Sequence, residues 1–97
     1  MEVWYLEEAF REGFGSAEWY EEQDPGLGER FCAEWKRAEN GMVSNPELPR
    51  FIHADVRRWR FQIFPYQLLY RVVPGGIQVL AVMHLARNPG YWKDRMK

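Results

Sequence analysis

The chain has 97 residues, 46% of them hydrophobic and 16% aromatic, so it is long enough for one domain with a modest core and too apolar to be disordered. Its formal charge is −1, yet residues 1–49 carry 12 acidic and four basic side chains, whereas residues 50–97 carry nine basic and two acidic ones. A uniformly basic nucleic-acid-binding protein and an acidic disordered tail are both excluded, because each would carry one sign of charge throughout. We therefore expect a polarised molecule with a single domain, residues 1–97.

Membrane insertion and disulfide bonding are not indicated. The apolar runs are far shorter than the roughly 20 residues of a membrane span, and the chain does not open with a secretory signal. Cys32 is the single cysteine and cannot form an intramolecular disulfide, which is typical of a cytoplasmic protein. Because Cys32 stands between Phe31 and Ala33 in a helical pattern, we predict that it fills the core rather than acting as a reactive thiol.

The acidic half of the chain has helical periodicity. It opens with a short apolar run at residues 3–6, a possible strand. Apolar or small residues then recur at the three-to-four spacing of one helix face: Leu6, Phe10, Phe14, Ala17 and Tyr20. Asp24-Pro25-Gly26 ends this helix, because proline lacks an amide donor and glycine tolerates a reversed turn. A second helix follows, with an apolar side formed by Leu27, Phe31, Trp35, Ala38 and Met42.

The basic half changes to a period of two after a loop at residues 44–49. Apolar and polar side chains alternate over residues 56–63 and 66–73, and Pro74-Gly75-Gly76 turns the chain into a third run, residues 77–83. The third run is apolar on both faces, as expected of a strand with a neighbour on each side. Two helices followed by a meander predict an α+β fold in which a helical layer covers one face of an antiparallel sheet.

Strand parity divides the side chains of this sheet between two faces. One face should meet the helices and carries Trp59, Phe61, Leu68, Tyr70 and Val72. The other should be open and carries Arg58, Arg60, Gln67, Arg71, Gln78 and His84. Like charges on one face repel each other unless an anionic partner meets them, which favours a binding role for Arg58 and Arg60.

Several kinds of catalytic site are poorly supported. His53 and His84 are far apart in the sequence, and Cys32 has no partner at ligand spacing, so we expect no metal. There is no glycine-rich phosphate loop and no nucleophile motif around Ser16 or Ser44, so we expect no nucleotide cofactor and no serine chemistry.

The C-terminal third combines residue types that suit RNA cleavage. Attack by a 2′-hydroxyl needs a proton acceptor, a proton donor and a cation for the phosphate; His84 or Tyr91 could move protons and Arg87 could stabilise charge. Tyr91 and Trp92 offer flat surfaces for an unstacked base. The alternative is structural: His84 caps a strand, Tyr91 and Trp92 pack on the core, and the arginines are solvated or pair with a protein.

The order of motifs resembles the RelE/ParE superfamily of bacterial type II toxins, also called plasmid stabilisation proteins. The resemblance runs through nearly the whole chain and rests on Ala9-x-x-Glu12, Trp19-Tyr20-Glu21, Pro25-Gly26-Leu27-Gly28-x-x-Phe31, Pro46, Val56-Arg57-Arg58, Phe64-Pro65-Tyr66, Tyr70, Val79-Leu80-Ala81-Val82-x-His84-x-x-Arg87-x-Pro89-x-Tyr91-Trp92 and Arg95. It implies a strand, a helical hairpin and an antiparallel meander, in agreement with the fold expected from the residue patterns.

The resemblance also implies a partner and a target. Toxins of this family are cytosolic and are held inactive by a cognate antitoxin, which wraps them with an acidic, partly disordered segment; operator DNA is bound only through the antitoxin. One branch of the family cuts messenger RNA on the ribosome, and the other inhibits DNA gyrase without being a nuclease. No membrane partner is implied.

Within the family, we expect gyrase inhibition rather than RNA cleavage. The nucleases are strongly basic, whereas this chain has a charge of −1 and carries Leu85 and Ala86 where a basic pair is often found. Target binding would then involve Arg58, Arg60, Arg71, Trp92 and Arg95. A ribosome-dependent endoribonuclease using His84, Arg87 and Tyr91 remains an alternative, as does a non-toxic relative that binds its antitoxin only as a corepressor.

Overall fold

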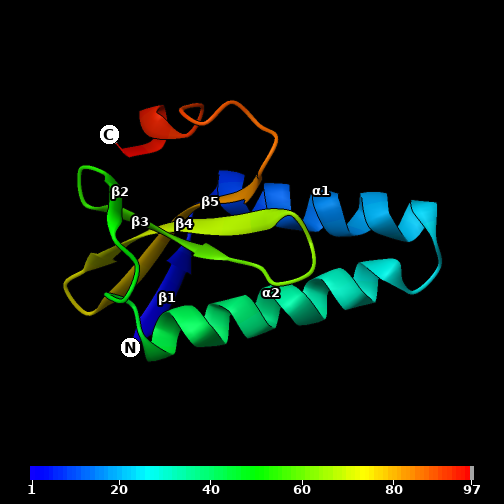
Figure 1. Ribbon diagram of the computed structural model, residues 1–97, viewed down its shortest axis with the longest axis horizontal. Helices are drawn as coiled ribbons and strands as arrows, with labels where there is room; N and C mark the ends of the chain where they lie inside the picture. The colour runs from blue at the N-terminus through cyan, green and yellow to red at the C-terminus, as the bar shows by residue number, and fades with distance from the viewer. Residues whose placement is uncertain (97) are drawn as a thin grey trace.

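The change of period along the sequence corresponds to a helical hairpin followed by a sheet (Figure 1). The computed structural model describes residues 1–96. Its elements in chain order are β1 (Glu2–Tyr5), α1 (Glu7–Gln23), α2 (Leu27–Ser44), β2 (Phe51–His53), β3 (Val56–Arg60), β4 (Tyr66–Val73), β5 (Gly76–His84) and a 3-10 turn (Lys93–Met96). The predicted helices and the three strands of the meander are confirmed, and so is the possible N-terminal strand.

The five strands form one sheet in the order β1-β5-β4-β3-β2. β1 pairs parallel to β5, and the remaining neighbours are antiparallel. β5 lies between β1 and β4 and is buried along most of its length, which confirms its predicted inner position. β2 was not predicted, because its three residues are all exposed and carry no alternation.

The two helices approach closely along a stripe of small residues. α1 buries Ala9, Gly13 and Ala17, and a Cβ placed on Gly13 would overlap the ring of Trp35 on α2. The prediction of the buried face of α1 was therefore partly wrong, because Phe10 and Phe14 are 42% and 54% exposed. The pattern weighted large side chains, whereas close helix contact needs small ones at the interface.

Each face of the sheet has its own hydrophobic cluster. The face toward the helices contains Phe61, Leu68 and Tyr70, as strand parity predicted. The opposite face was expected to be open, but Trp92 covers part of it and packs with Val56, Leu69, Leu80, Ala81 and Met83. Figure 1 shows the C-terminal segment on the side of the sheet away from α2. Gln67, expected on this open face, is consequently buried, and its amide Nε2 lies 3.6 Å from Sδ of Met83.

The predicted face of His84 was wrong, because β5 contains a β-bulge. Tyr70 pairs with Val79 and Leu69 pairs with Ala81, so Leu80 is an extra residue on β5. The extra residue reverses the parity of the rest of the strand. His84 is therefore opposite Tyr66, on the face toward the helices, and not on the face of Arg58 and Arg60.

Cys32 is exposed, and its prediction as core filler was wrong. It lines a hollow together with Phe10 and Phe14 of α1 and Trp35 of α2, and burial of its thiol by neighbouring side chains still raises the pKa of Cys32. Glu34, two residues further along α2, is only 3% exposed. Its carboxylate is buried because the N–H groups of Ile63 and Phe64 donate hydrogen bonds to it.

Candidate functional site

The C-terminal residues singled out in the sequence converge on one carboxylate, Glu12 of α1. Both oxygens of Glu12 accept hydrogen bonds from the guanidinium of Arg95, at 2.9 and 2.8 Å. The hydroxyl of Tyr91 donates to Oε2 at 2.7 Å, and the backbone N–H of Val82 donates to Oε1 at 3.1 Å. Nη1 of Arg87 lies 3.5 Å from Oε2. Arg87, Tyr91 and Arg95 are thus held together by an acid from the other end of the chain.

The electrostatics of this Glu12 cluster oppose proton abstraction by Tyr91. Burial and the hydrogen bond to Glu12 raise the pKa of Tyr91 far above its ordinary value. The hydrogen bonds to Glu12 likewise raise the pKa of Arg95. Both guanidinium groups also lie over the ring of Tyr91, Arg87 at 3.8 Å and Arg95 at 5.0 Å from its centroid. Tyr91 is therefore a neutral hydrogen-bond donor. The carboxylate of Glu12 already neutralises the positive charge of the nearby arginines, and a bound phosphate would need that positive charge.

His84 lies apart from the Glu12 oxygens, in a groove between α1 and the end of β5. Its Nδ1 accepts a hydrogen bond from the N–H of Ala86 at 3.0 Å, and its ring packs edge-on against Tyr66 with centroids 5.0 Å apart. The groove has a volume of about 300 Å³ and is lined by Arg11, Glu12, Gly15, Ser16, Trp19, Tyr66, Val82, His84 and Arg87. His84 and Arg87 therefore share one surface with an exposed tryptophan.

Trp92 is 2% exposed, and its indole N–H donates to the carbonyl of Pro89 at 2.7 Å. A buried ring has no free face for a nucleobase. The structure therefore favours the packing alternative for Trp92, which fastens the C-terminal segment to the sheet.

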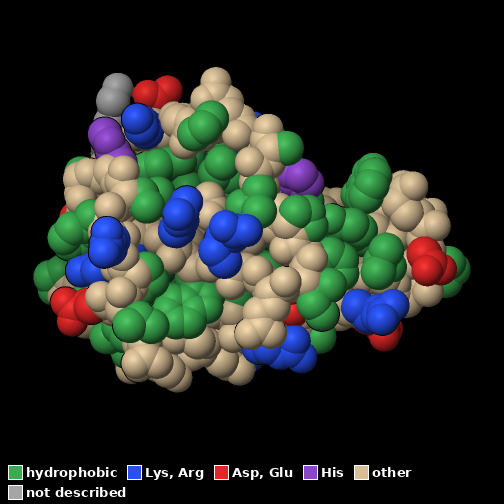
Figure 2. All heavy atoms as spheres, in the orientation of Figure 1, with side chains coloured by type: hydrophobic (Ala, Val, Ile, Leu, Met, Phe, Trp, Pro, Cys, Tyr) green, Lys and Arg blue, Asp and Glu red, His purple; other side chains and the backbone are tan. Residues whose placement is uncertain are grey.

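The arginines of the sheet differ from those of the Glu12 cluster. Arg71 is paired with Asp55, with Nε 3.3 Å from Oδ2. Arg58 and Arg60 are exposed and form no ion pair with any of residues 1–96. Figure 2 shows Lys and Arg side chains gathered over the middle of the face on which β2 and β3 lie, with Asp and Glu mostly at its margins. Arg58 and Arg60 thus present unneutralised charge to solvent.

Two carboxylates that hold distant segments together, Glu12 and Glu34, were not among the predicted site residues. Their partners lie far along the chain: Arg95 for Glu12, and the N–H groups of Ile63 and Phe64 for Glu34. The only sequence signal was the presence of Glu12 in the family-like motif near the N-terminus. No local pattern distinguishes Glu34 from the acids around it.

Metal and membrane sites were also sought in the structure. Among residues 1–96, no three His, Cys, Asp or Glu side chains are grouped as metal ligands would be. Within the same residues, neither helix has the length and apolarity that crossing a membrane requires.

Comparison with known proteins gives a likeness in structure rather than in sequence. No family model matches the chain, and no curated protein is significantly similar to it in sequence. A solved structure titled "Chromosomal ParDE TA system from P. aeruginosa" contains a chain that superposes with a TM-score of 0.76 at 17% sequence identity. The match covers 88% of this chain and 96% of that one. This confirms the α+β, RelE/ParE-like fold that the motif order predicted.

Proposed function

We propose that the protein is the toxin of a type II toxin–antitoxin pair, a growth inhibitor that a cognate antitoxin neutralises. The observation that carries the proposal is the fold shared with a chain of a ParDE system over nearly the full length of both chains. The charge distribution supports it independently. Arg58 and Arg60 are exposed and unneutralised among residues 1–96, as expected of a surface that meets an anionic partner.

Within this proposal, DNA gyrase is the favoured target and RNA cleavage is disfavoured. Cleavage would need a base and a free cation at the reacting phosphate. The pKa of Tyr91 is raised, and the carboxylate of Glu12 accepts hydrogen bonds from Arg95 and lies 3.5 Å from Arg87. Inhibition by binding requires only an accessible surface, which Arg58 and Arg60 provide.

A growth assay tests the proposal. The protein is produced alone from a tightly controlled promoter in bacteria, with its accumulation verified, and a frameshifted copy of the same message serves as the control. We expect growth to stop with the intact protein and to continue with the control. Unchanged growth in the presence of folded protein would contradict toxicity and leave the corepressor alternative, in which the protein binds its antitoxin, and only their complex binds the operator, without harming the cell.

The groove beside α1 favours a second candidate, a ribosome-dependent endoribonuclease. His84 and Arg87 lie in this groove with the exposed ring of Trp19, an arrangement that could hold a base and a phosphate. His84 would carry the proton, since Tyr91 is committed to Glu12. Replacing His84 or Arg87 by Ala should then abolish new cuts in the ribosomal A site without preventing antitoxin binding. Ribosome profiling that finds no such cuts for the unmodified protein would eliminate this candidate.

A further inference from the structure

A groove runs between α1 and α2 on the surface of the helical hairpin. Two hollows, of about 210 and 410 Å³, are lined by residues of both helices and share Cys32. The first is lined mainly by aromatic side chains, those of Tyr5, Phe10, Phe14 and Trp35. The second is lined by the acids Glu18, Glu21 and Glu29 and by the small residues Ala17 and Gly28. This hairpin groove therefore has an aromatic end and an acidic end.

The aromatic end is held in shape by contacts among its own rings. The ring of Phe10 stacks on those of Tyr5 and Phe14, with centroids 4.6 and 5.8 Å apart, and Phe14 meets Trp35 edge-on at 5.3 Å. Phe10 and Phe14 are nevertheless exposed, and exposed apolar patches mark interaction sites. An apolar cavity of roughly 150 Å³ is large enough to bind benzene. The hollow of about 210 Å³ therefore has room for one large apolar side chain of another molecule.

The acidic end carries negative charge that has no internal partner. Glu18 and Glu29 form no ion pair with any of residues 1–96. Burial and then the charge of Glu29 raise the pKa of Cys32, so this charge lies beside the groove. Glu21 is already engaged, because its carboxylate accepts hydrogen bonds from the first N–H groups of α2. Two unpaired carboxylates on neighbouring helices repel each other, and a cation bound between them removes the repulsion.

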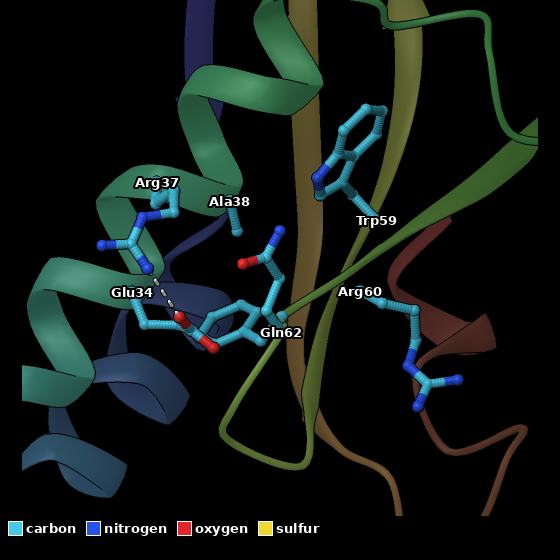
Figure 3. Close-up of a pocket in the computed structure, with 7 residues that line it drawn as sticks. Glu34, Arg37, Ala38, Trp59, Arg60 and Gln62 are labelled. Carbon is cyan, nitrogen blue, oxygen red and sulfur yellow. Dashed lines mark hydrogen bonds and ion pairs between the residues drawn. The ribbon is translucent and has the colours of Figure 1, made fainter.

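Other acids of α2 are neutralised within the molecule. Figure 3 shows Glu34 beside Arg37, and Nη1 of Arg37 lies 3.2 Å from Oε1 of Glu34. Glu39, at the aromatic end of the groove, pairs with Lys36 at the same distance. The unpaired acids of the hairpin groove are therefore those of its acidic end.

We propose that the hairpin groove binds a basic amphipathic helix of a partner protein. The apolar face of such a helix would enter the groove, as in other helix-in-groove complexes, and its Lys or Arg residues would meet Glu18 and Glu29. The groove follows residues 28–39 of α2, which at 1.5 Å per residue is about 16 Å, or roughly three turns of the partner helix. The proposal is independent of the proposed function, because an acidic antitoxin segment would be repelled from this surface.

Charge complementarity selects a basic segment over a second copy of the chain. Two hairpin grooves packed face to face would bring four unpaired carboxylates together, and like charges in an interface oppose association. The side chains of Lys and Arg suit both ends of the groove. Their aliphatic stems pack on apolar surface while the charged group stays at the border, and the charge is attracted to the faces of aromatic rings.

The test uses isotope-labelled full-length protein and an acetylated, amidated peptide of about 18 residues, long enough to form a helix. The peptide contains Ala, Leu and Lys, with Leu at the three-to-four spacing of one helix face. We expect amide shifts confined to residues 10–18 and 28–39. A peptide with Glu in place of Lys should give none, and a scrambled peptide of the same composition should bind at least tenfold more weakly.

Amide variants test the acidic end. E18Q/E29Q removes both unpaired charges and should weaken binding of the Lys peptide about tenfold at low salt, with a smaller effect at high salt. E2Q/E47Q changes the net charge equally at exposed positions outside the groove and should bind normally. All four positions are exposed, so both proteins should fold, which an unchanged amide spectrum verifies.

A second pair of variants tests the aromatic end. Phe14→Ser should weaken binding of the Lys peptide about tenfold, because it removes an exposed ring from the wall of the hollow. Phe51→Ser is the matched control, since Phe51 is exposed to a similar extent on β2 and lies outside the groove. It should bind normally.

Three results would overturn the proposal. One is binding of the Glu peptide or the scrambled peptide as tightly as the Lys peptide. Another is equal weakening by the groove variants and their matched controls. The third is the appearance of the same shifts when the protein alone is concentrated, which would identify a second copy as the occupant.

Discussion

Two groups of arginines differ in how their charge is neutralised. Arg95, with Arg87 nearby, faces the partly buried carboxylate of Glu12, whose side chain is 13% exposed. Arg58 and Arg60 lie on an exposed strand edge without an acidic partner in the described part of the chain. The comparison shows that positive charge on a surface does not by itself indicate whether the arginines stabilise the fold or bind another molecule. Arginines with an internal partner hold the fold together, and those without one are available to other molecules.

The largest effect should come from Glu12→Ala, which leaves Arg95, Tyr91 and the N–H of Val82 without their acceptor. We expect the free energy of unfolding to fall by about 3–5 kcal/mol, the usual result of breaking a partly buried ion pair. Urea unfolding measures it. Glu7→Ala is the control, because Glu7 forms an ion pair with Arg11 at 2.7 Å in which both side chains are 75% exposed, and it should cost less than about 1 kcal/mol. Similar losses for both variants would contradict a structural role that Glu12 has and an exposed acid lacks.

Arg95→Ala should have the next largest effect, about 2–3 kcal/mol, since it removes charge-assisted hydrogen bonds to Glu12 and the bond to the carbonyl of Leu80. Arg87→Ala should cost under about 1 kcal/mol, because the Arg87 side chain is 51% exposed and only one of its nitrogens approaches Glu12, at 3.5 Å. Urea unfolding of the two variants side by side checks the order. A larger loss for Arg87→Ala would contradict the view that Arg95 is the main partner of Glu12.

Tyr91→Phe should cost about 1–2 kcal/mol at neutral pH through the lost hydrogen bond to Glu12. The pKa of Tyr91 is higher in the folded than in the unfolded protein, so its contribution is complete below about pH 10 and is lost as the pH rises further. The difference in unfolding free energy between the unmodified protein and Tyr91→Phe should therefore shrink at alkaline pH. Unfolding curves at neutral and alkaline pH measure it, and a pH-independent difference would contradict the raised pKa.

Arg58→Ala and Arg60→Ala should have the smallest effects on stability, within about 0.5 kcal/mol, because exposed and unpaired side chains contribute little. They should nevertheless weaken the binding of acidic peptides. The same urea unfolding series, combined with peptide titration, checks both halves of this expectation. A clear loss of stability would show that these arginines have an internal role after all.

The fold was predictable because two different periods divide the chain. Apolar spacing of three to four located α1 and α2, alternation located β3 and β4, and a run that is apolar on both faces located β5. The predictions that were wrong concerned local geometry that leaves no mark on the pattern of apolar residues. The extra residue at Leu80 reversed the face of His84, and α1 buries its small residues Ala9, Gly13 and Ala17 while Phe10 and Phe14 stay partly exposed.

The candidate site was predicted in part. The residue types drew attention to Arg87, Tyr91 and Arg95, and the structure brings these together. The carboxylate that joins them could not be identified, because Glu12 and Arg95 are 83 positions apart and an acid on a helix is ordinarily hydrated. The packing role of Trp92 could not be predicted either, because its burial depends on how the C-terminal segment lies against the sheet.

Gyrase inhibition through the exposed arginines is tested most directly by a supercoiling assay with purified gyrase, relaxed plasmid and purified protein. We predict that supercoiling falls as the protein is added, and that R58E/R60E inhibits far less than R11E/K36E at the same concentration. The double variant R11E/K36E changes the net charge equally at exposed positions on the helices. Full supercoiling activity in a molar excess of the folded, unmodified protein would contradict gyrase as the target.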